Sequence, residues 1–142
     1  MGKKRIVKTA SSEGEGASKA PVSSSKRRVE TGILYVESTY NNTKLTLTDT
    51  KGNTLAWSSS GSLGFKGAKK GTPFAAAKVG ELLAQKAQTI GLKKTDVIVK
   101  GVGSGRESSI RGFLSKGIAI GTIRDMTPVP HNGPKPKKPR RV

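Results

Sequence analysis

Residues 101–133 read GVGSGRESSIRGFLSKGIAIGTIRDMTPVPHNG, and the remaining sequence supports or extends this stretch. A glycine-rich turn leads into a short helix, an apolar strand follows, and a Pro-His-Asn-Gly turn ends the stretch. Gly101, Gly103 and Gly105 permit positive φ angles and let another group approach the main chain closely. The stretch therefore predicts a strand-to-helix connection with an accessible main chain.

The helix is predicted to begin at Ser104, because Ser104 and Glu107 have the spacing of a capping box. Unpaired N–H groups at a helix start attract a phosphate oxygen, and Arg106 and Arg111 add charged donors at the same end. The alternative is a plain tight connection with solvated arginines, since glycine-rich turns are common. The turn alone leaves both interpretations open.

One face of this helix is predicted to pack on the core through Ile110, Phe113 and Leu114. The glycine spacing lacks the third glycine of a dinucleotide fingerprint, and no P-loop motif occurs. Gly103 stands at the centre of GVGSG, where a nucleophile elbow requires serine. The turn therefore matches no known nucleotide or nucleophile motif.

Alternating apolar and polar residues predict five strands along the chain. A longer helix is predicted between the third and fourth strands, with Thr72 as its cap and Pro73 at its first position. Its apolar stripe contains Val79, Leu82, Leu83 and Ile90 and ends at Gly91. The predicted strands cover residues 32–38, 43–48, 54–58, 96–100 and 118–123, the fourth being buried through Val97, Ile98 and Val99. The order βββαβαβ predicts an α/β fold with a mixed sheet flanked by helices.

The charge is far from balanced, with 27 Lys and Arg against 9 Asp and Glu, a formal net charge of +18 over 142 residues. It divides into +6 in residues 1–28, +7 in 29–125 and +5 in 126–142. We expect a basic disordered arm, an α/β core and an extended basic tail over these three ranges. A polycation of this kind indicates a polyanionic partner, and nucleic acid fits best.

Other classes are less compatible with the sequence. No apolar run is long enough to span a bilayer, and the basic ends lack the apolar face of a membrane-surface helix. The start has no signal-peptide core, and the absence of cysteine fits the cytosol. Catalysis is not expected, nor is a metal or cofactor, because the acids Glu37, Asp49, Asp96 and Asp125 are scattered and His131 is the single histidine.

Residues 58–72, SSSGSLGFKGAKKGT, form a long predicted loop in which lysines lie beside one aromatic ring, Phe65, that we expect to be exposed. Lys66, Lys69 and Lys70 next to Phe65 on flexible backbone suit an irregular RNA surface. A plain mobile loop is the alternative.

Both ends of the chain add candidates. Three consecutive basic residues, Lys26 to Arg28, precede the core, and three prolines keep the tail from Pro134 to Pro139 extended, so that its bases can reach between RNA helices. His131 is interpreted as a turn residue that stacks on or hydrogen-bonds to RNA. A solvated arm without a partner is the alternative for the first segment. Asn132-Gly133 is the single Asn-Gly pair, where isoaspartate can form with little steric hindrance, the alternative being an ordinary turn.

Several motifs in one order resemble the small-subunit ribosomal protein S11 family. They are YNNT at 40–43, TDTKGN at 48–53, GFKGAKKGTPFAA at 64–76, GSGRESSIRG at 103–112 and TPVPHNG at 127–133. The resemblance covers residues 32–142, and the basic PHNG tail resembles the bacterial branch. Two features depart from it: the family commonly has proline where this chain has Val102, and residues 1–25 have no counterpart.

The resemblance implies an RNase H-like core that binds 16S ribosomal RNA in the platform of the small subunit, near the messenger RNA exit. It implies ribosomal proteins S six, S eighteen and S seven as neighbours, and a cytoplasmic location. It implies no membrane partner and no small-molecule substrate. A free-standing RNA chaperone is the alternative function, and a structural protein without nucleic acid would leave the +18 charge unexplained.

From the patterns and the resemblance together we expect a set of ribosomal RNA contacts on loops, on one helix end and on both tails. The candidates are Lys26, Arg27, Arg28, Asn41, Asn42, Phe65, Lys66, Lys69, Lys70, Ser104, Arg106, Arg111, His131, Lys135, Lys137, Lys138, Arg140 and Arg141.

Overall fold

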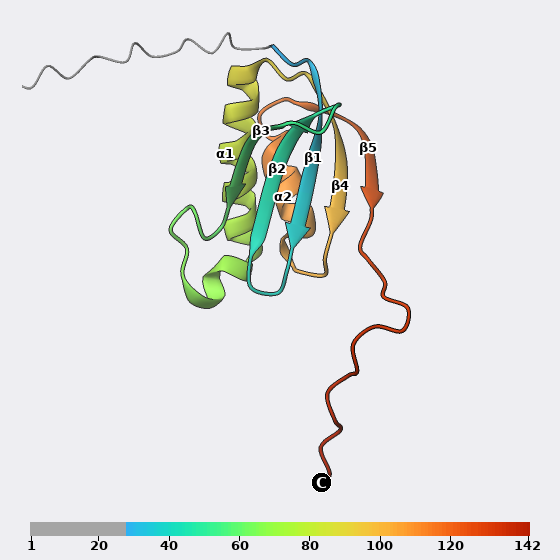
Figure 1. Ribbon diagram of the computed structural model, residues 1–142. Helices are drawn as coiled ribbons and strands as arrows, with labels where there is room; N and C mark the ends of the chain where they lie inside the picture. The colour runs from blue at the N-terminus through green and yellow to red at the C-terminus, as the bar shows by residue number, and fades with distance from the viewer. Residues whose placement is uncertain (1–27) are drawn as a thin grey trace, which may run out of the picture.

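The computed structural model describes residues 28–142, so the predicted contacts Lys26 and Arg27 lie outside the described residues. Five strands and two α-helices follow one another in the predicted order βββαβαβ (Figure 1). Their bounds are β1 Thr31–Ser38, β2 Thr43–Asp49, β3 Thr54–Ser59, α1 Pro73–Ile90, β4 Lys94–Lys100, α2 Gly105–Leu114 and β5 Ala119–Asp125, with a 3-10 turn η1 at Gly67–Gly71.

The strands form one mixed sheet in the order β3-β2-β1-β4-β5. The pairs β1–β2 and β2–β3 are antiparallel, whereas β1–β4 and β4–β5 are parallel. The chain therefore makes a meander first and then two crossovers through helices, which confirms the mixed sheet expected from the sequence.

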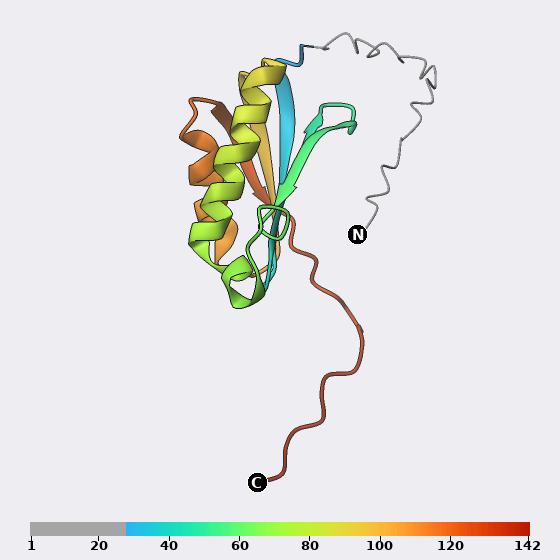
Figure 2. The same ribbon diagram turned by 90° about the vertical axis from the view of Figure 1, so that its left-hand side faces the viewer.

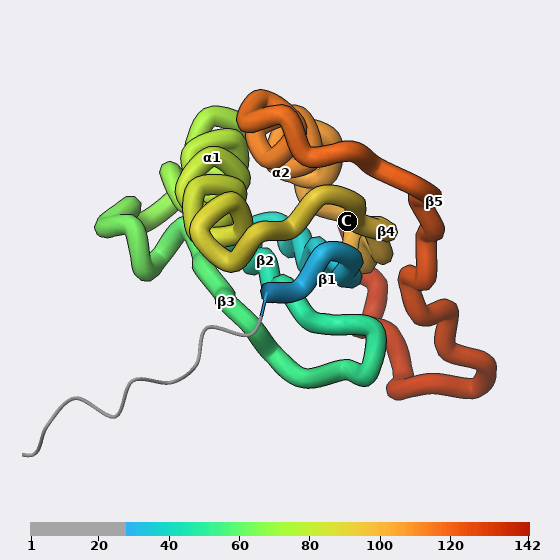
Figure 3. The backbone as a smooth tube through the Cα atoms, turned by 90° about the horizontal axis from the view of Figure 1, so that it is seen from above, coloured from blue at the N-terminus to red at the C-terminus, as the bar shows by residue number. Residues whose placement is uncertain are grey.

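Both helices lie on the same face of this sheet (Figures 2 and 3). The reason is the handedness of the two crossovers. From β3 to β4 and from β4 to β5 the chain moves in the same direction across the sheet, and right-handed crossovers in one direction place their helices on one side. Within residues 28–142 the opposite face carries no helix, and we call it the open face.

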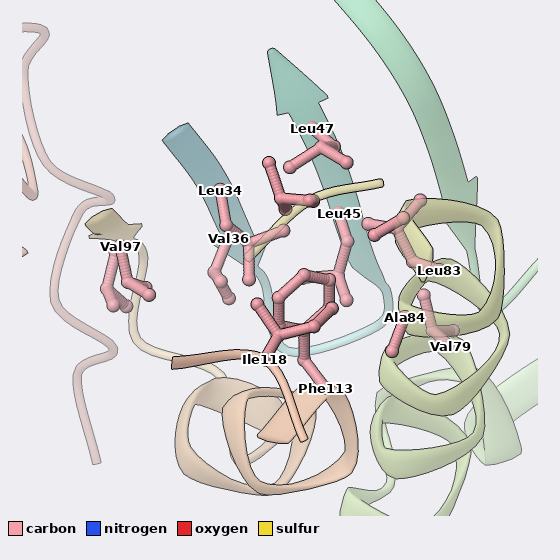
Figure 4. Packing of buried hydrophobic residues seen from close by; sticks show 13 residues of the cluster. Leu34, Val36, Leu45, Leu47, Val79, Leu83, Ala84, Val97, Phe113 and Ile118 are labelled. Carbon is pink, nitrogen blue, oxygen red and sulfur yellow. The ribbon is translucent and has the colours of Figure 1, made fainter. Parts of the chain in front are cut away.

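The core fills the space between the sheet and the two helices. Phe113 of α2 is fully buried and lies against the apolar side chains of β1 and β2, with α1 beside them (Figure 4). The fully buried side chains around it include Leu34, Val36, Leu45, Leu47, Val79, Leu83 and Val97. In β1 and β2, alternation points the leucine and valine side chains inward and those of the residues between them to the open face.

The ends of α1 match the sequence prediction. The Thr72 hydroxyl accepts a hydrogen bond from the amide of Ala75 at 3.4 Å, and Pro73 is the first helical residue. Gly91 ends the helix with a φ of 93°, a left-handed conformation that glycine adopts without a Cβ clash.

Two predicted core positions are wrong. Ile98 of β4 is half-buried and faces the open side, because residues 97 and 99 take the inward positions of the alternation. Leu114 is 39 % exposed at the end of α2, where Gly112 and Phe113 occupy the contact with the rest of the domain.

The two helices pack so closely that small residues are required at the contact. A Cβ at Gly80 of α1 would collide with the carbonyl oxygen of Ser109 and lie 2.9 Å from the amide nitrogen of Phe113. A Cβ at Gly112 of α2 would collide in the same way with the carbonyl oxygen of Ala77. This approach seats Phe113 over the sheet.

We expect Gly80→Ala to lower the free energy of unfolding by about 1–3 kcal/mol through overpacking, although alanine favours a helix by about 1 kcal/mol over glycine. Urea unfolding followed by circular dichroism measures the difference. Gly61→Ala is the matched control, because its nearest neighbouring atom would be 3.8 Å away, and it should change stability little. Wild-type stability in Gly80→Ala would contradict the close packing.

Candidate nucleic-acid interface

One end of the sheet gathers three connections that are far apart in sequence. These are the β1–β2 turn at residues 39–42, the loop at residues 60–72 and the glycine-rich turn at residues 101–104, all at the lower end in Figure 1. We call this region the loop end. The carboxyl ends of β1, β4 and β5 also lie here because these strands are parallel.

Hydrogen bonds join the three connections. The hydroxyl of Ser60 lies 2.5 Å from Asn42 Oδ1 and 2.8 Å from the carbonyl oxygen of Lys70. The Ser104 hydroxyl donates to the carbonyl oxygen of Gly71 at 2.7 Å. The loop that carries the lysines is therefore tied to the β1–β2 turn on one side and to the start of α2 on the other.

Glycines allow the main chains to touch at the same place. A Cβ at Gly71 would collide with the carbonyl oxygen of Tyr40, and one at Gly103 with the carbonyl oxygen of Thr39. The Gly103 amide instead donates to the carbonyl oxygen of Ser38 at 2.9 Å. The predicted close approach at the glycine-rich turn is thus made by the protein's own β1–β2 turn.

The loop presents cations beside aromatic rings. Lys66 and Lys69 are exposed and Lys70 is half-buried. None of the three forms an ion pair within residues 28–142. Ammonium groups without a carboxylate partner remain available for phosphates.

The aromatic part of the loop end differs from the prediction. Phe65 is half-buried, and its ring packs edge-on against Phe74 with a centroid distance of 6.2 Å and an interplanar angle of 85°. Phe74 is the more exposed ring, at 65 %, and Lys78 Nζ lies 5.7 Å from its centroid. Phe74 is not among the predicted contacts, because it follows Pro73 in the first turn of the predicted helix and lies outside the predicted loop. Its position two residues after Thr72, the last residue of that loop, is the sequence feature that indicates its closeness to the lysines.

The predicted capping box at α2 is wrong, although the helix does begin after Ser104. The Ser104 side chain makes no cap hydrogen bond, because its hydroxyl donates to Gly71 across the loop end instead. Glu107 pairs with Arg111 at 3.6 Å, one turn along the helix, and both side chains are more than 80 % exposed. Arg111 thus remains accessible at the surface, with a solvent-screened partner.

Arg106 has a structural partner that the sequence did not indicate. Its guanidinium contacts Asp125 Oδ2 at 2.5 Å at the end of β5 and donates to the carbonyl oxygen of Gly101. Asp125 Oδ1 accepts from the Thr127 amide at 3.0 Å and from its hydroxyl at 2.6 Å. The Thr127 hydroxyl in turn accepts from the Gly101 amide at 3.2 Å. We call these four residues the tail clamp.

The tail clamp fixes the point where the basic tail leaves the domain. Beyond it, residues 128–142 are exposed and have no regular secondary structure, so His131 and the five bases from Lys135 to Arg141 extend away from the loop end (Figure 1). Asn132 has a φ of 55°, a left-handed value that is uncommon outside glycine. The tail and the loop end therefore share one side of the molecule.

The predicted contacts are not all brought together. Asn41 is exposed and Asn42 half-buried at the loop end, near Lys70. Arg28 lies at the opposite end of the domain, where its side chain approaches Gly91 at the end of α1. The structure thus gathers the loop and turn candidates, leaves the tail candidates extended from the same end of the domain, and separates Arg28 from all of them.

Within residues 28–142 no group of three or more His, Cys, Asp or Glu side chains could hold a metal ion. In the same range, no helix has both the length and the apolar character required to cross a membrane.

A protein-family model described as Ribosomal protein S11 matches residues 32–141. The matched range contains every element from β2 to β5, all but the first residue of β1, the loop end and nearly all of the basic tail. Arg28 and the segment before it lie outside the match.

The tail clamp predicts an acid-resistant carboxylate. Hydrogen bonds from the Thr127 hydroxyl and amide, followed by that from Arg106, lower the pKa of Asp125 from 3.8 to about 2. Because the folded value is the lower one, the clamp stabilises the fold above pH 3.8 and loses this contribution as the pH falls toward 2. We expect the Asp125 carboxyl to stay ionised at about pH 3 when titrated by NMR.

Thr127→Val and Arg106→Gln should each raise this titration midpoint, because each removes a donor to the carboxylate. Arg111→Gln is the matched control on the same helix, since Arg111 pairs with Glu107 and not with Asp125. A midpoint near 3.8 in the unmodified protein would rule out the clamp in solution.

Proposed function

Because the chain belongs to the ribosomal protein S11 family, we propose that it binds 16S ribosomal RNA in the platform of the small subunit and helps to shape the messenger RNA exit cleft. The family itself makes the chain a structural constituent of the small ribosomal subunit that binds ribosomal RNA and other ribosomal proteins in translation, without enzymatic activity. The proposal for the finer placement is supported by the loop end, where one loop carries three lysines without ion-pair partners among residues 28–142 and a phenylalanine ring that packs against Phe74.

The proposed mechanism is contact with RNA of fixed shape by a preformed protein surface. Ser60 and Ser104 hold the lysine loop against the rest of the loop end, so that little conformational freedom has to be given up when RNA binds. Lys66, Lys69 and Lys70 neutralise phosphates, while Phe74 supplies the exposed ring for stacking. Specificity then comes from the shape of the folded RNA more than from base identity.

The tails add reach to this surface. The tail from residue 126 to 142 carries five bases and no acid, and the tail clamp directs it from the same side as the lysine loop. We assign three functional parts: a basic arm at 1–28, an RNA-binding core at 29–125 and a penetrating tail at 126–142. Arg106 acts as a positioning residue for the tail in this scheme, whereas Arg111 and the tail bases contact RNA directly.

We also propose a cytoplasmic location for the protein and a set of neighbours in the small subunit. Ribosomal proteins S six, S eighteen and S seven are its proposed neighbours, with messenger RNA close by in the exit cleft. The Pro-His-Asn-Gly motif at residues 130–133 favours the bacterial type of the family. A free-standing RNA chaperone is the competing function, and it predicts a soluble pool outside the particle.

Sedimentation of a cell lysate tests the proposal directly. We expect the protein to run with small subunits and whole ribosomes and to remain there after a moderate-salt wash. Lys69→Gln/Lys70→Gln should weaken binding to small-subunit RNA. The slope of log K against log salt should become shallower by up to about 0.9 for each phosphate that the variant no longer neutralises.

Lys51→Gln/Lys86→Gln is the matched control, because both lysines lie away from the loop end and are exposed. Recovery of the protein at the top of the gradient would support the chaperone instead. Equal slopes of log K against log salt in the two double variants would show that the lysine loop is not part of the interface.

We also propose that Asn132 is converted in part to isoaspartate. Gly133 offers no side chain to block attack of its amide on the Asn132 side chain, and the turn is exposed. Peptide mass spectrometry with isoaspartate-specific methylation should detect the product in aged protein and should find none in Gly133→Val. Equal methylation of both proteins would argue for an ordinary turn.

A further inference from the structure

The open face carries a continuous row of side chains across all five strands. Strand register aligns Trp57, Thr46, Tyr35, Ile98 and Arg124 in that order from β3 to β5. Trp57 is 56 % exposed, and the three residues between it and exposed Arg124 are half-buried. Two aromatic rings therefore lie on an uncovered sheet, two strands or roughly 10 Å apart.

Cations surround this row. Lys44 and Lys100 are the register neighbours of Glu37 on either side, and Lys44 Nζ lies 3.8 Å from its carboxylate. One carboxylate thus stands between two lysines. Arg124, at the β5 end of the row, adds a third cation, and Asp96, two residues before Ile98 on β4, adds a second carboxylate. Three cations and two carboxylates leave this part of the face net positive.

The open face also has two shallow hollows, one on each side of β1. The first is lined by Lys44, Thr46, Thr54 and Trp57. The second lies over β4, between β1 and β5, and is lined by Ile33, Asp96, Val97, Ile98, Thr122 and Arg124. Each hollow therefore combines an apolar wall with a cation at its rim, and the second also contains the Asp96 carboxylate, which accepts a hydrogen bond from the Thr122 amide.

We propose that the open face binds unpaired RNA, with Trp57 and Tyr35 as stacking platforms and Lys44, Lys100 and Arg124 as phosphate contacts. Exposed rings on an open sheet stack bases without sequence preference, and every base offers a π-face. The positive charge of the face complements RNA and disfavours the chain's own basic tail as the occupant. This surface lies on the sheet face, apart from the lysine loop, so the inference does not depend on the loop-end proposal.

The protein contains a single tryptophan, and this residue, Trp57, reports on the face directly. We expect an unpaired RNA of about 12 nucleotides, a length within the usual range for stacking sites, to quench the fluorescence of the full chain. A fully paired RNA duplex of equal charge should bind without comparable quenching, because its bases are already stacked.

Two substitutions at Trp57 test whether its aromatic ring contributes to binding by stacking. Trp57→Ala should weaken binding of the unpaired RNA about tenfold, in line with removal of one stacking platform. Trp57→Phe keeps a ring and should retain most of the affinity. Circular dichroism of both variants should match the unmodified protein, since Trp57 is more than half exposed.

The Lys69→Gln/Lys70→Gln protein distinguishes the two surfaces. Quenching that persists in this variant supports the open face as an independent site, whereas quenching that disappears overturns it. Unchanged Trp57 fluorescence with unpaired RNA, together with equal affinity of Trp57→Ala, would also overturn the inference. Weakened duplex binding by the lysine variant would still support the loop end in that case.

Discussion

Main-chain contacts that only glycine permits hold the loop end together. Gly71 and Gly103 allow the carbonyl oxygens of Tyr40 and Thr39 to approach where a Cβ would collide. A Cβ at either position would push these main chains apart and would strain the hydrogen bonds by which Ser60 and Ser104 join the three segments. The sequence feature that resembles a phosphate-binding turn is thus first a packing device, and its effect on binding is to hold the cations in place.

The distribution of charged partners follows from this arrangement. The Asp125 carboxylate accepts hydrogen bonds from Thr127 and pairs with Arg106. The Asp49 carboxylate accepts hydrogen bonds from Asn53 and from the amide of Lys51, and Glu30 pairs with Lys93. Most acids of the described core therefore have local structural roles, while the lysines of the loop have no carboxylate partner among residues 28–142. The excess positive charge is consequently concentrated where the fold leaves it exposed.

Local patterns predicted the elements well, because alternation and helix ends depend on neighbouring residues, as Thr72, Pro73 and Gly91 illustrate. The pairing of Arg106 with Asp125 was not predictable, since it joins residues 19 positions apart and depends on how β5 lies beside β4. The alternation in β1 indicated two faces but not which one the helices cover. That choice depends on the strand order, which the sequence does not encode locally.

An uncovered face has an energetic consequence for a sheet of this kind. The helix-covered side is closed by Phe113 and its neighbours, whereas Trp57 keeps more than half of its surface in water on the other side. Burial of that ring would contribute favourably, at about 25 cal/mol per Å² of apolar area, and neutralising the adjacent cations would contribute further. A ligand that is both flat and anionic satisfies both terms at once, whereas an apolar protein surface would cover Lys100 and Arg124, which form no ion pair among residues 28–142. The physical demands of the open face therefore favour nucleic acid.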